Sequence, residues 1–297
     1  MQRILILGAA GQVGSALLAQ GIAGADLIGR AARDIDITDP AALAAALAAT
    51  QPALVINCAA FTAVDRAETE AERAFAVNAR GAGLVAQACA DHGLPLIHLS
   101  TDYVFDGSKP APYTETDPVA PLGVYGQSKA EGEARVRAAL PQHLILRLSW
   151  IFSNSHPSFF GTMLRLGAER PELRVVNDQI GGPTFAGHIA LAIAAMAGRA
   201  LHHGDNSRAD TIWGTYHYAD APDASWHDFA AAIFATAARH GLKTPKLTAI
   251  PSSEYPLPAK RPANSRFDCS KLSARFGIAR ADWRQAVEAC CAARAAG

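Results

Sequence analysis

The chain has 297 residues, half of them apolar, and its 27 Lys and Arg side chains balance 27 Asp and Glu side chains. This length fits two domains, or one Rossmann-type domain with a smaller lobe. The balanced charge gives no reason to expect nucleic acid or an anionic membrane surface as a partner, and no segment approaches the ~20 apolar residues of a membrane span. The five cysteines show neither CxxC spacing nor a paired framework, so we expect reduced thiols in a cytoplasmic protein.

The first predicted strand runs directly into a glycine-rich turn. An apolar run at residues 4–7 is followed by the segment Gly8-Ala9-Ala10-Gly11-Gln12-Val13-Gly14 and then by a helical pattern. This order predicts a dinucleotide site, because glycines let the backbone approach a pyrophosphate at the helix N-terminus. The GxxGxxG spacing resembles that of the short-chain dehydrogenase/reductase superfamily, particularly its extended branch that modifies nucleotide sugars. The expected cofactor contacts in this turn are Gly8, Gly11, Gln12 and Val13.

The second predicted strand, residues 26–29, ends at Arg30 rather than at an acidic residue. NAD-specific sites place Asp or Glu here, whereas a guanidinium suits the 2′-phosphate of NADPH. We therefore predict that Arg30 favours NADPH, with NADH possible; the alternative is that Arg30 and Arg33 are solvated loop charges. In the resembling superfamily an Asp-Ile step at this place contacts adenine, and here that step is Asp36 and Ile37.

Small residues follow the third predicted strand, residues 53–57. Small side chains at the carboxyl end of a strand allow a ligand to lie against the backbone, and this segment resembles the Asn-Ala-Ala type of the superfamily. A helical pattern from about residue 68 to residue 92 carries Asn78, which either supports the active site or is an ordinary polar residue of a helix. The cofactor contacts expected after the third strand are Cys58, Ala59, Ala60 and Thr62.

Tyr125 and Lys129 lie four residues apart at the start of a helical pattern, so they share one helix face. A phenol can act as an acid near neutral pH if a neighbouring ammonium stabilises its phenolate, and Lys129 is placed to do this. By itself the pair is a weak signal, because this spacing is common by chance in surface helices. The fourth predicted strand, residues 95–99, adds to it by ending in the segment Ser100-Thr101-Asp102-Tyr103-Val104-Phe105-Asp106-Gly107.

This last segment, with Glu115-Thr116-Asp117 and the Tyr125/Lys129 pair, closely resembles the family of dTDP-4-dehydrorhamnose reductases. Further matches at residues 62–68, 147–150, 177–179 and 261–266 extend the resemblance over nearly the whole chain. It implies an NADPH-dependent oxidoreductase that reduces the 4-keto group of dTDP-4-dehydro-β-L-rhamnose to give dTDP-β-L-rhamnose, the closing step of dTDP-rhamnose biosynthesis. It also implies a dTDP-sugar as the substrate. We expect the protein to be a monomer or a homodimer.

The same resemblance assigns roles to individual side chains. Tyr125 would donate the proton, Lys129 would hold the nicotinamide ribose and lower the pKa of the tyrosine, and Thr101 would fix the carbonyl or the phenol. The substrate contacts that it implies are Thr101, Asp102, Trp150, Asn177, Arg261 and Arg266. For Trp150 the alternative is a plain core tryptophan.

The second half of the chain has recognisable elements. The patterns predict strands at residues 143–148 and 214–219, a strand and turn over residues 173–184, and helices at residues 159–167, at 188–197 and from Ser225 onward. The proline-rich residues 255–262 must form a loop. We expect this loop to bring Lys260, Arg261 and Arg266 to the surface, where they suit a diphosphate or form a solvated basic loop.

Single residues argue for or against several other functions. Related 4,6-dehydratases carry Thr-Asp-Glu where this chain has Tyr103, and a phenol cannot replace that carboxylate as a base at neutral pH. A reductase or epimerase of another nucleotide sugar stays open, as does a non-catalytic regulatory subunit on the same fold. Some family members are metal-bridged dimers that use an acidic residue on the first helix, where this chain has Ser15-Ala16-Leu17; we therefore expect no metal.

We expect an α/β fold, a Rossmann-type doubly wound parallel sheet with a smaller C-terminal substrate-binding lobe. Residues 1–150 would form the NAD(P)-binding domain, with later segments returning to the sheet. Residues 151–297 would mainly form the lobe.

Overall fold

The computed structural model describes residues 1–202 and 212–296. Six parallel strands form the central sheet in the order β10-β5-β4-β3-β1-β2. The strands are β1 (Gln2–Leu7), β2 (Ala25–Arg30), β3 (Leu54–Asn57), β4 (Leu96–Thr101), β5 (His143–Leu148) and β10 (Gly214–Tyr218). Their order reverses between β1 and β3, which is the point where doubly wound sheets bind ligands. The predicted α/β, Rossmann-type fold is confirmed.

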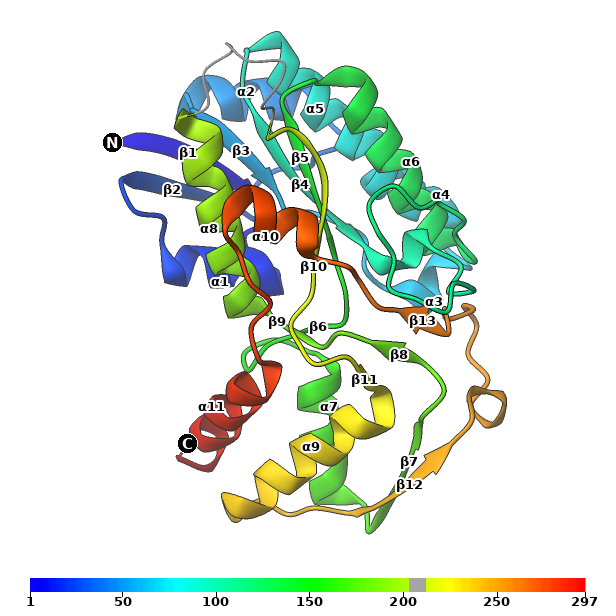
Figure 1. Cartoon of the computed structure of the whole chain (residues 1–297). Coiled ribbons are helices and arrows are strands. Elements are labelled where there is room, and N and C mark those ends of the chain that lie inside the picture. Colours follow the sequence, from blue (N-terminus) through cyan, green and yellow to red (C-terminus); the bar gives the residue numbers. More distant parts are fainter. Residues whose placement is uncertain (203–211, 297) are drawn as a thin grey trace.

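Helices cover both faces of this sheet (Figure 1). On one face, α1 (Gln12–Gln20) and α8 (Ala186–His202) share a buried core with the strands. On the other, α2 (Pro40–Thr50), α5 (Ala82–Asp91) and α6 (Val124–Ala139) do so. Because both faces are covered, the central strands are continuous apolar runs such as those at residues 4–7 and 54–56.

The lobe lies beyond the carboxyl ends of the strands (Figure 1). Its core is shared by α7 (Phe159–Glu169), α9 (Trp226–Arg239) and α11 (Trp283–Ala296), and β7 (Glu172–Val176) pairs in parallel with β12 (Lys246–Ile250). The short elements are β6 (Ile151–Phe152), β8 (Ile180–Gly181), β9 (Thr184–Phe185), β11 (Ala224–Ser225), β13 (Asn264–Ser265) and α10 (Ser270–Phe276). Strand β10 and helix α8 return to the sheet from this half of the chain. The boundary at residue 150 stays a prediction.

The helix predicted over about residues 68–92 is present without a gap over residues 71–91, but it contains a π-helical turn. The structure has α3 (Val64–Ala67), α4 (Ala71–Phe75), a π-helical turn η1 (Ala76–Gly81) and then α5. A π turn inserts one residue into the helical ladder, and here it carries Asn78. The amide of Asn78 bonds both backbone groups of Phe61, at 2.8 and 3.0 Å, and donates to the Ser128 hydroxyl at 3.0 Å. It therefore ties the loop after β3 to α6, the supporting role proposed for it. None of the described helices is both long and apolar enough to cross a membrane.

Candidate active site

The glycine-rich turn joins β1 to α1 at the point where the strand order reverses. Gly8 has a φ of +78°, and a Cβ on it would meet the Ala59 backbone nitrogen at 2.5 Å. A Cβ on Gly14 would meet the Gly8 carbonyl oxygen at 2.4 Å, so this glycine lets α1 pack closely on the turn. No side chain caps the N-terminus of α1, where backbone N–H groups favour an anion. The turn, with Gly11 exposed in it, therefore fits the pyrophosphate of a dinucleotide.

Arg30, at the end of β2, lies beside this turn. Its carbonyl oxygen accepts hydrogen bonds from the Gly8 and Ala9 backbone at 2.9 and 3.0 Å, and its guanidinium donates to the Gly29 carbonyl at 3.1 Å. Among the residues that the structure describes, no carboxylate forms an ion pair with Arg30. Its positive charge is therefore suited to bind a 2′-phosphate.

The loop after β6 also borders the turn. The Ser153 hydroxyl donates to Gln12 Oε1 at 2.9 Å, and His156 Nε2 lies 3.1 Å from the Ala10 carbonyl oxygen. The sequence does not indicate Ser153 and His156, because Ser153 stands 141 residues from Gln12 along the chain and no motif connects the two segments.

The other predicted cofactor residues are placed as follows. Cys58, Ala59 and Ala60 follow β3 and are half-buried, and the Gly8 contact brings them against the glycine turn. Val13 and Ile37 are buried, whereas Thr62 is exposed. Asp36 is also exposed, and the backbone N–H of Thr38, which donates to it at 2.8 Å, lowers its pKa.

The three predicted catalytic side chains meet at the end of β4. Tyr125 and Lys129 lie on the buried face of α6 and are 9% and 2% exposed. The Lys129 ammonium donates to the Leu99 carbonyl oxygen at 2.6 Å, and Thr101, the last residue of β4, lies close enough to the Tyr125 phenol to act on its pKa. The structure therefore brings together the groups that the helical spacing and the family resemblance pointed to.

Burial controls the pKa values of this cluster. It raises the pKa of Tyr125 above its ordinary value, and the neighbouring Thr101 hydroxyl offsets only part of that effect. It lowers the pKa of Lys129 to about 8, against the opposing charge of Glu133. Lys129 is not among the described groups that shift the pKa of Tyr125 in this structure, so the expectation that it lowers the tyrosine pKa stays a prediction.

Asp102 and Tyr103 extend the cluster toward the lobe. Asp102 Oδ1 accepts a hydrogen bond from the Thr101 hydroxyl at 3.0 Å. The Ser265 hydroxyl is near, but Oδ2 has no donor in hydrogen-bonding geometry among the described side chains, and burial raises the pKa of Asp102 to about 6. The Tyr103 ring contacts the Tyr125 ring edge to face, with 5.5 Å between centroids.

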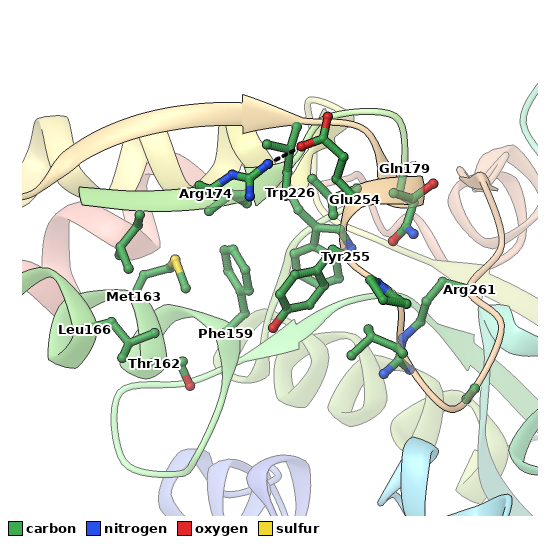
Figure 2. Close-up of a pocket in the computed structure, with 18 of the residues that line it drawn as sticks. Phe159, Thr162, Met163, Leu166, Arg174, Gln179, Trp226, Glu254, Tyr255 and Arg261 are labelled. Carbon is green, nitrogen blue, oxygen red and sulfur yellow. Dashed lines mark hydrogen bonds and ion pairs between the residues drawn. The ribbon is translucent and has the colours of Figure 1, made fainter. Parts of the chain in front are cut away.

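A cavity of about 870 Å³ opens beside Tyr103, between the lobe and the proline-rich loop. Figure 2 shows apolar side chains of α7 at one end, among them Phe159, Met163 and Leu166, and Arg261 at the other. Trp226 and Tyr255 line it between these ends. Aromatic and apolar walls with a guanidinium at one end suit a ligand that has both a flat ring and a negative charge.

Arg261 is the one predicted substrate residue that lines this cavity. Its guanidinium donates to Asp65 at 2.8 Å and to the Tyr103 hydroxyl at 3.0 Å, and its side chain is only 18% exposed. The expectation that the loop carries Arg261 to the surface is therefore wrong, because its ion pair with Asp65 holds the side chain mostly buried. Lys260 is exposed and lines the cavity as well.

Trp150, Asn177 and Arg266 do not line the cavity. Trp150 stacks on Trp226, with 3.5 Å between ring centroids, and so supports a residue that does. Asn177 is exposed, while its near neighbour Gln179 faces the cavity. Arg266 donates to Asn264 and to the Pro110 carbonyl oxygen, so it braces a loop.

Nothing in the sequence indicates that Phe159 and Trp226 line a cavity. Each stands at the start of a helix, and an aromatic residue at that position looks the same whether it faces a core or a ligand. A search of the described residues finds no group of three or more His, Cys, Asp or Glu that could hold a metal ion.

Comparison with known proteins gives consistent results. The chain matches the family described as RmlD substrate binding domain over residues 1–295. It is 42% identical over 285 residues to a dTDP-4-dehydrorhamnose reductase of Sinorhizobium fredii, which covers 96% of this chain and 95% of that protein. It is 38% identical over 297 residues to the Escherichia coli dTDP-4-dehydrorhamnose reductase, with 96% and 95% coverage. The crystal structure of the Bacillus anthracis dTDP-4-dehydrorhamnose reductase in complex with NADP matches with a TM-score of 0.88 and 33% identity, covering 97% of this chain and 98% of that one.

Proposed function

Because this chain belongs to the family of dTDP-4-dehydrorhamnose reductases, we propose that it reduces the 4-keto group of dTDP-4-dehydro-β-L-rhamnose to give dTDP-β-L-rhamnose. It is an NAD(P)H-dependent oxidoreductase of dTDP-rhamnose biosynthesis. The observation that carries the proposal is the meeting of Thr101, Tyr125 and Lys129 at the end of β4, next to the cavity that Arg261 lines.

The chain's own residues supply the proton for this reduction. The nicotinamide supplies the hydride when it is bound. Tyr125 is then the proton donor: burial keeps its phenol protonated, and a developing alkoxide is a stronger base than a phenolate, so the transfer is favourable. Thr101, fixed by the Tyr103 backbone N–H at 3.2 Å and by Asp102, orients the phenol. Lys129 holds the nicotinamide ribose.

We propose NADPH as the preferred cofactor, with NADH as a possible second one. The support is the position of Arg30 beside the glycine turn, and the B. anthracis relative binds NADP. The contacts proposed for the cofactor are those at Gly8, Gly11, Gln12, Val13, Arg30, Asp36, Ile37, Cys58, Ala59, Ala60, Thr62, Tyr125 and Lys129. On the substrate side, the aromatic residues of the cavity would take the base and Arg261 the diphosphate.

We also propose that the protein works in the cytoplasm as a monomer or a homodimer. All five cysteines are free thiols, which favours a reducing compartment. The described site is assembled from one chain, and a second copy is therefore not needed to complete it.

The test is an assay with the purified protein, NADPH and dTDP-4-dehydro-β-L-rhamnose generated in situ from dTDP-glucose. We expect oxidation of NADPH that depends on the sugar nucleotide and yields dTDP-rhamnose, and slower turnover with NADH. Binding of NADPH without any oxidation would contradict the proposed substrate, and a product other than dTDP-rhamnose would assign the protein to a different nucleotide sugar.

A further inference from the structure

The buried face of α6 continues below the catalytic pair. Glu133 follows Lys129 by four residues, so it lies one turn further along the same face, and it is 0% exposed. Arg147 on β5 donates to both of its carboxylate oxygens, at 2.8 and 2.7 Å. Arg137, the next residue in this series, adds a hydrogen bond of 3.1 Å. The carboxylate is therefore ionised, since its arginine partners hold its pKa below the ordinary value against the effect of burial.

Lys129 faces few charged groups. Glu133 on its own helix and Cys58 beyond β3 act on its charge, and Lys129 in turn acts on His98 of β4. The Cys58 thiol stays neutral because burial raises its pKa to about 12, and the His98 imidazole is neutral because burial holds its pKa well below the usual range. Glu133 is therefore the group that supplies negative charge to this buried ammonium.

The position of α6 is fixed against three neighbouring elements, which are η2 (Asp102–Val104), η1 and β5. A Cβ on Gly126 would meet the Tyr103 carbonyl oxygen at 2.1 Å, and one on Gly132 would meet the Asn78 carbonyl oxygen at 2.0 Å. The third place is the ion pair of Glu133 with Arg147, whose β5 position is in register with Ser100 of β4. Leu99 and Thr101, the neighbours of Ser100, are the residues that contact Lys129 and Tyr125.

A buried ion pair needs a reason beyond stability, because apolar residues of similar volume often stabilise a fold as well or better. Arg147 is itself held from two other sides, by His217 Nε2 at 3.3 Å from its Nη1 and by the Phe105 ring at 5.0 Å. We propose that Glu133 and Arg147 are a positioning pair for Lys129: their ion pair fixes α6 over β5, the neighbour of β4, and Glu133 supplies the negative charge that keeps the Lys129 side chain an ammonium. This proposal depends on the proposed function in one respect, which is that Lys129 binds the cofactor.

The test is Glu133→Gln, with Glu131→Gln as the matched control on the exposed side of the same helix, where Glu131 pairs with Arg135. The primary measurement is NADPH affinity against pH without sugar nucleotide, followed by the pH profile of kcat/KM. Removing the Glu133 charge lowers the Lys129 pKa further, so we expect the alkaline loss of NADPH affinity to move down by about one pH unit, equal to a tenfold change in the ionisation constant. Glu131→Gln should leave the wild-type midpoint unchanged.

Glu133→Gln leaves Arg147 buried without its carboxylate, and this can prevent folding. The double variant Glu133→Gln/Arg147→Met removes both charges and is expected to fold. If the pair were only structural, a folded double variant would recover the wild-type midpoint, and that result would overturn the proposal. If the double variant instead loses NADPH affinity at a lower pH than the wild type, that result supports the proposal. If the wild-type chain binds NADPH but reduces no sugar nucleotide, the proposed function fails while this binding measurement still decides the role of Glu133.

Discussion

Three ionisable side chains of the site, Tyr125, Lys129 and Asp102, are each less than a tenth exposed. Burial disfavours the charged form of each one, so it raises the pKa values of Tyr125 and Asp102 and lowers that of Lys129. Buried groups of this kind lower the stability of a fold and cluster where chemistry requires them. We therefore expect that stability can be gained at this site only by losing activity.

Asp102 gives the clearest case. Its pKa rises from an ordinary 3.8 to about 6, so the folded protein binds more protons than the unfolded chain between these values. The contribution of Asp102 to the free energy of unfolding therefore falls as the pH rises through that window. Above pH ~6 the carboxylate is ionised and its full destabilising effect is present. We expect Asp102→Asn to raise the free energy of unfolding by about 2 kcal/mol at pH ~8, to change it little at pH ~3.5, and to lower kcat/KM.

Urea unfolding of both proteins at the two pH values measures this effect. A variant that is no more stable than wild type at the higher pH would show that ionised Asp102 costs the fold nothing. The same gain at both pH values would show that the effect does not come from its titration.

At the scale of single elements, α6 depends on its glycines. A side chain on Gly132 would press into the Asn78 carbonyl, which is backbone and cannot turn away. We expect Gly132→Ala to lower the free energy of unfolding by about 1–3 kcal/mol and to reduce activity by lifting Lys129 from β4. Gly198→Ala on α8 is the control, because a Cβ there meets none of the described atoms within 4 Å, and it should add about 0.5–1 kcal/mol to the free energy of unfolding. If chemical denaturation showed equal effects for the two, α6 would not be closely packed at this point.

The longer elements could be predicted because their patterns are strong. Buried parallel strands appear as apolar runs, and Ser225 does cap the N-terminus of α9, through a capping box with Asp228. The π turn at Asn78 could not be predicted, because its extra residue is stabilised by hydrogen bonds to Phe61 and Ser128, and these lie far away in the sequence. Strands of two residues, such as β8, are too short to show any period.

At the scale of the whole molecule, the site lies where two halves of the chain meet. The sheet domain supplies Thr101 from β4 and Tyr125 and Lys129 from α6, which helical spacing and resemblance together indicated. The lobe supplies the cavity, and its lining could not be predicted, since Phe159 and Trp226 come together only through tertiary packing. The resemblance identified Arg261, but its ion pair with Asp65 of α3 depends on how the loop folds back on the sheet domain.

The central claim is that Tyr125 donates the proton to the reduced sugar. The most direct measurement is the rate of NADPH oxidation by Tyr125→Phe with dTDP-4-dehydro-β-L-rhamnose, beside Tyr218→Phe, which removes a buried hydroxyl bonded to Asp220 at 2.9 Å outside the site. We expect Tyr125→Phe to bind NADPH normally and to lose about 10²–10⁴-fold in kcat, while Tyr218→Phe keeps turning over. Turnover by Tyr125→Phe within a few-fold of wild type would contradict the account.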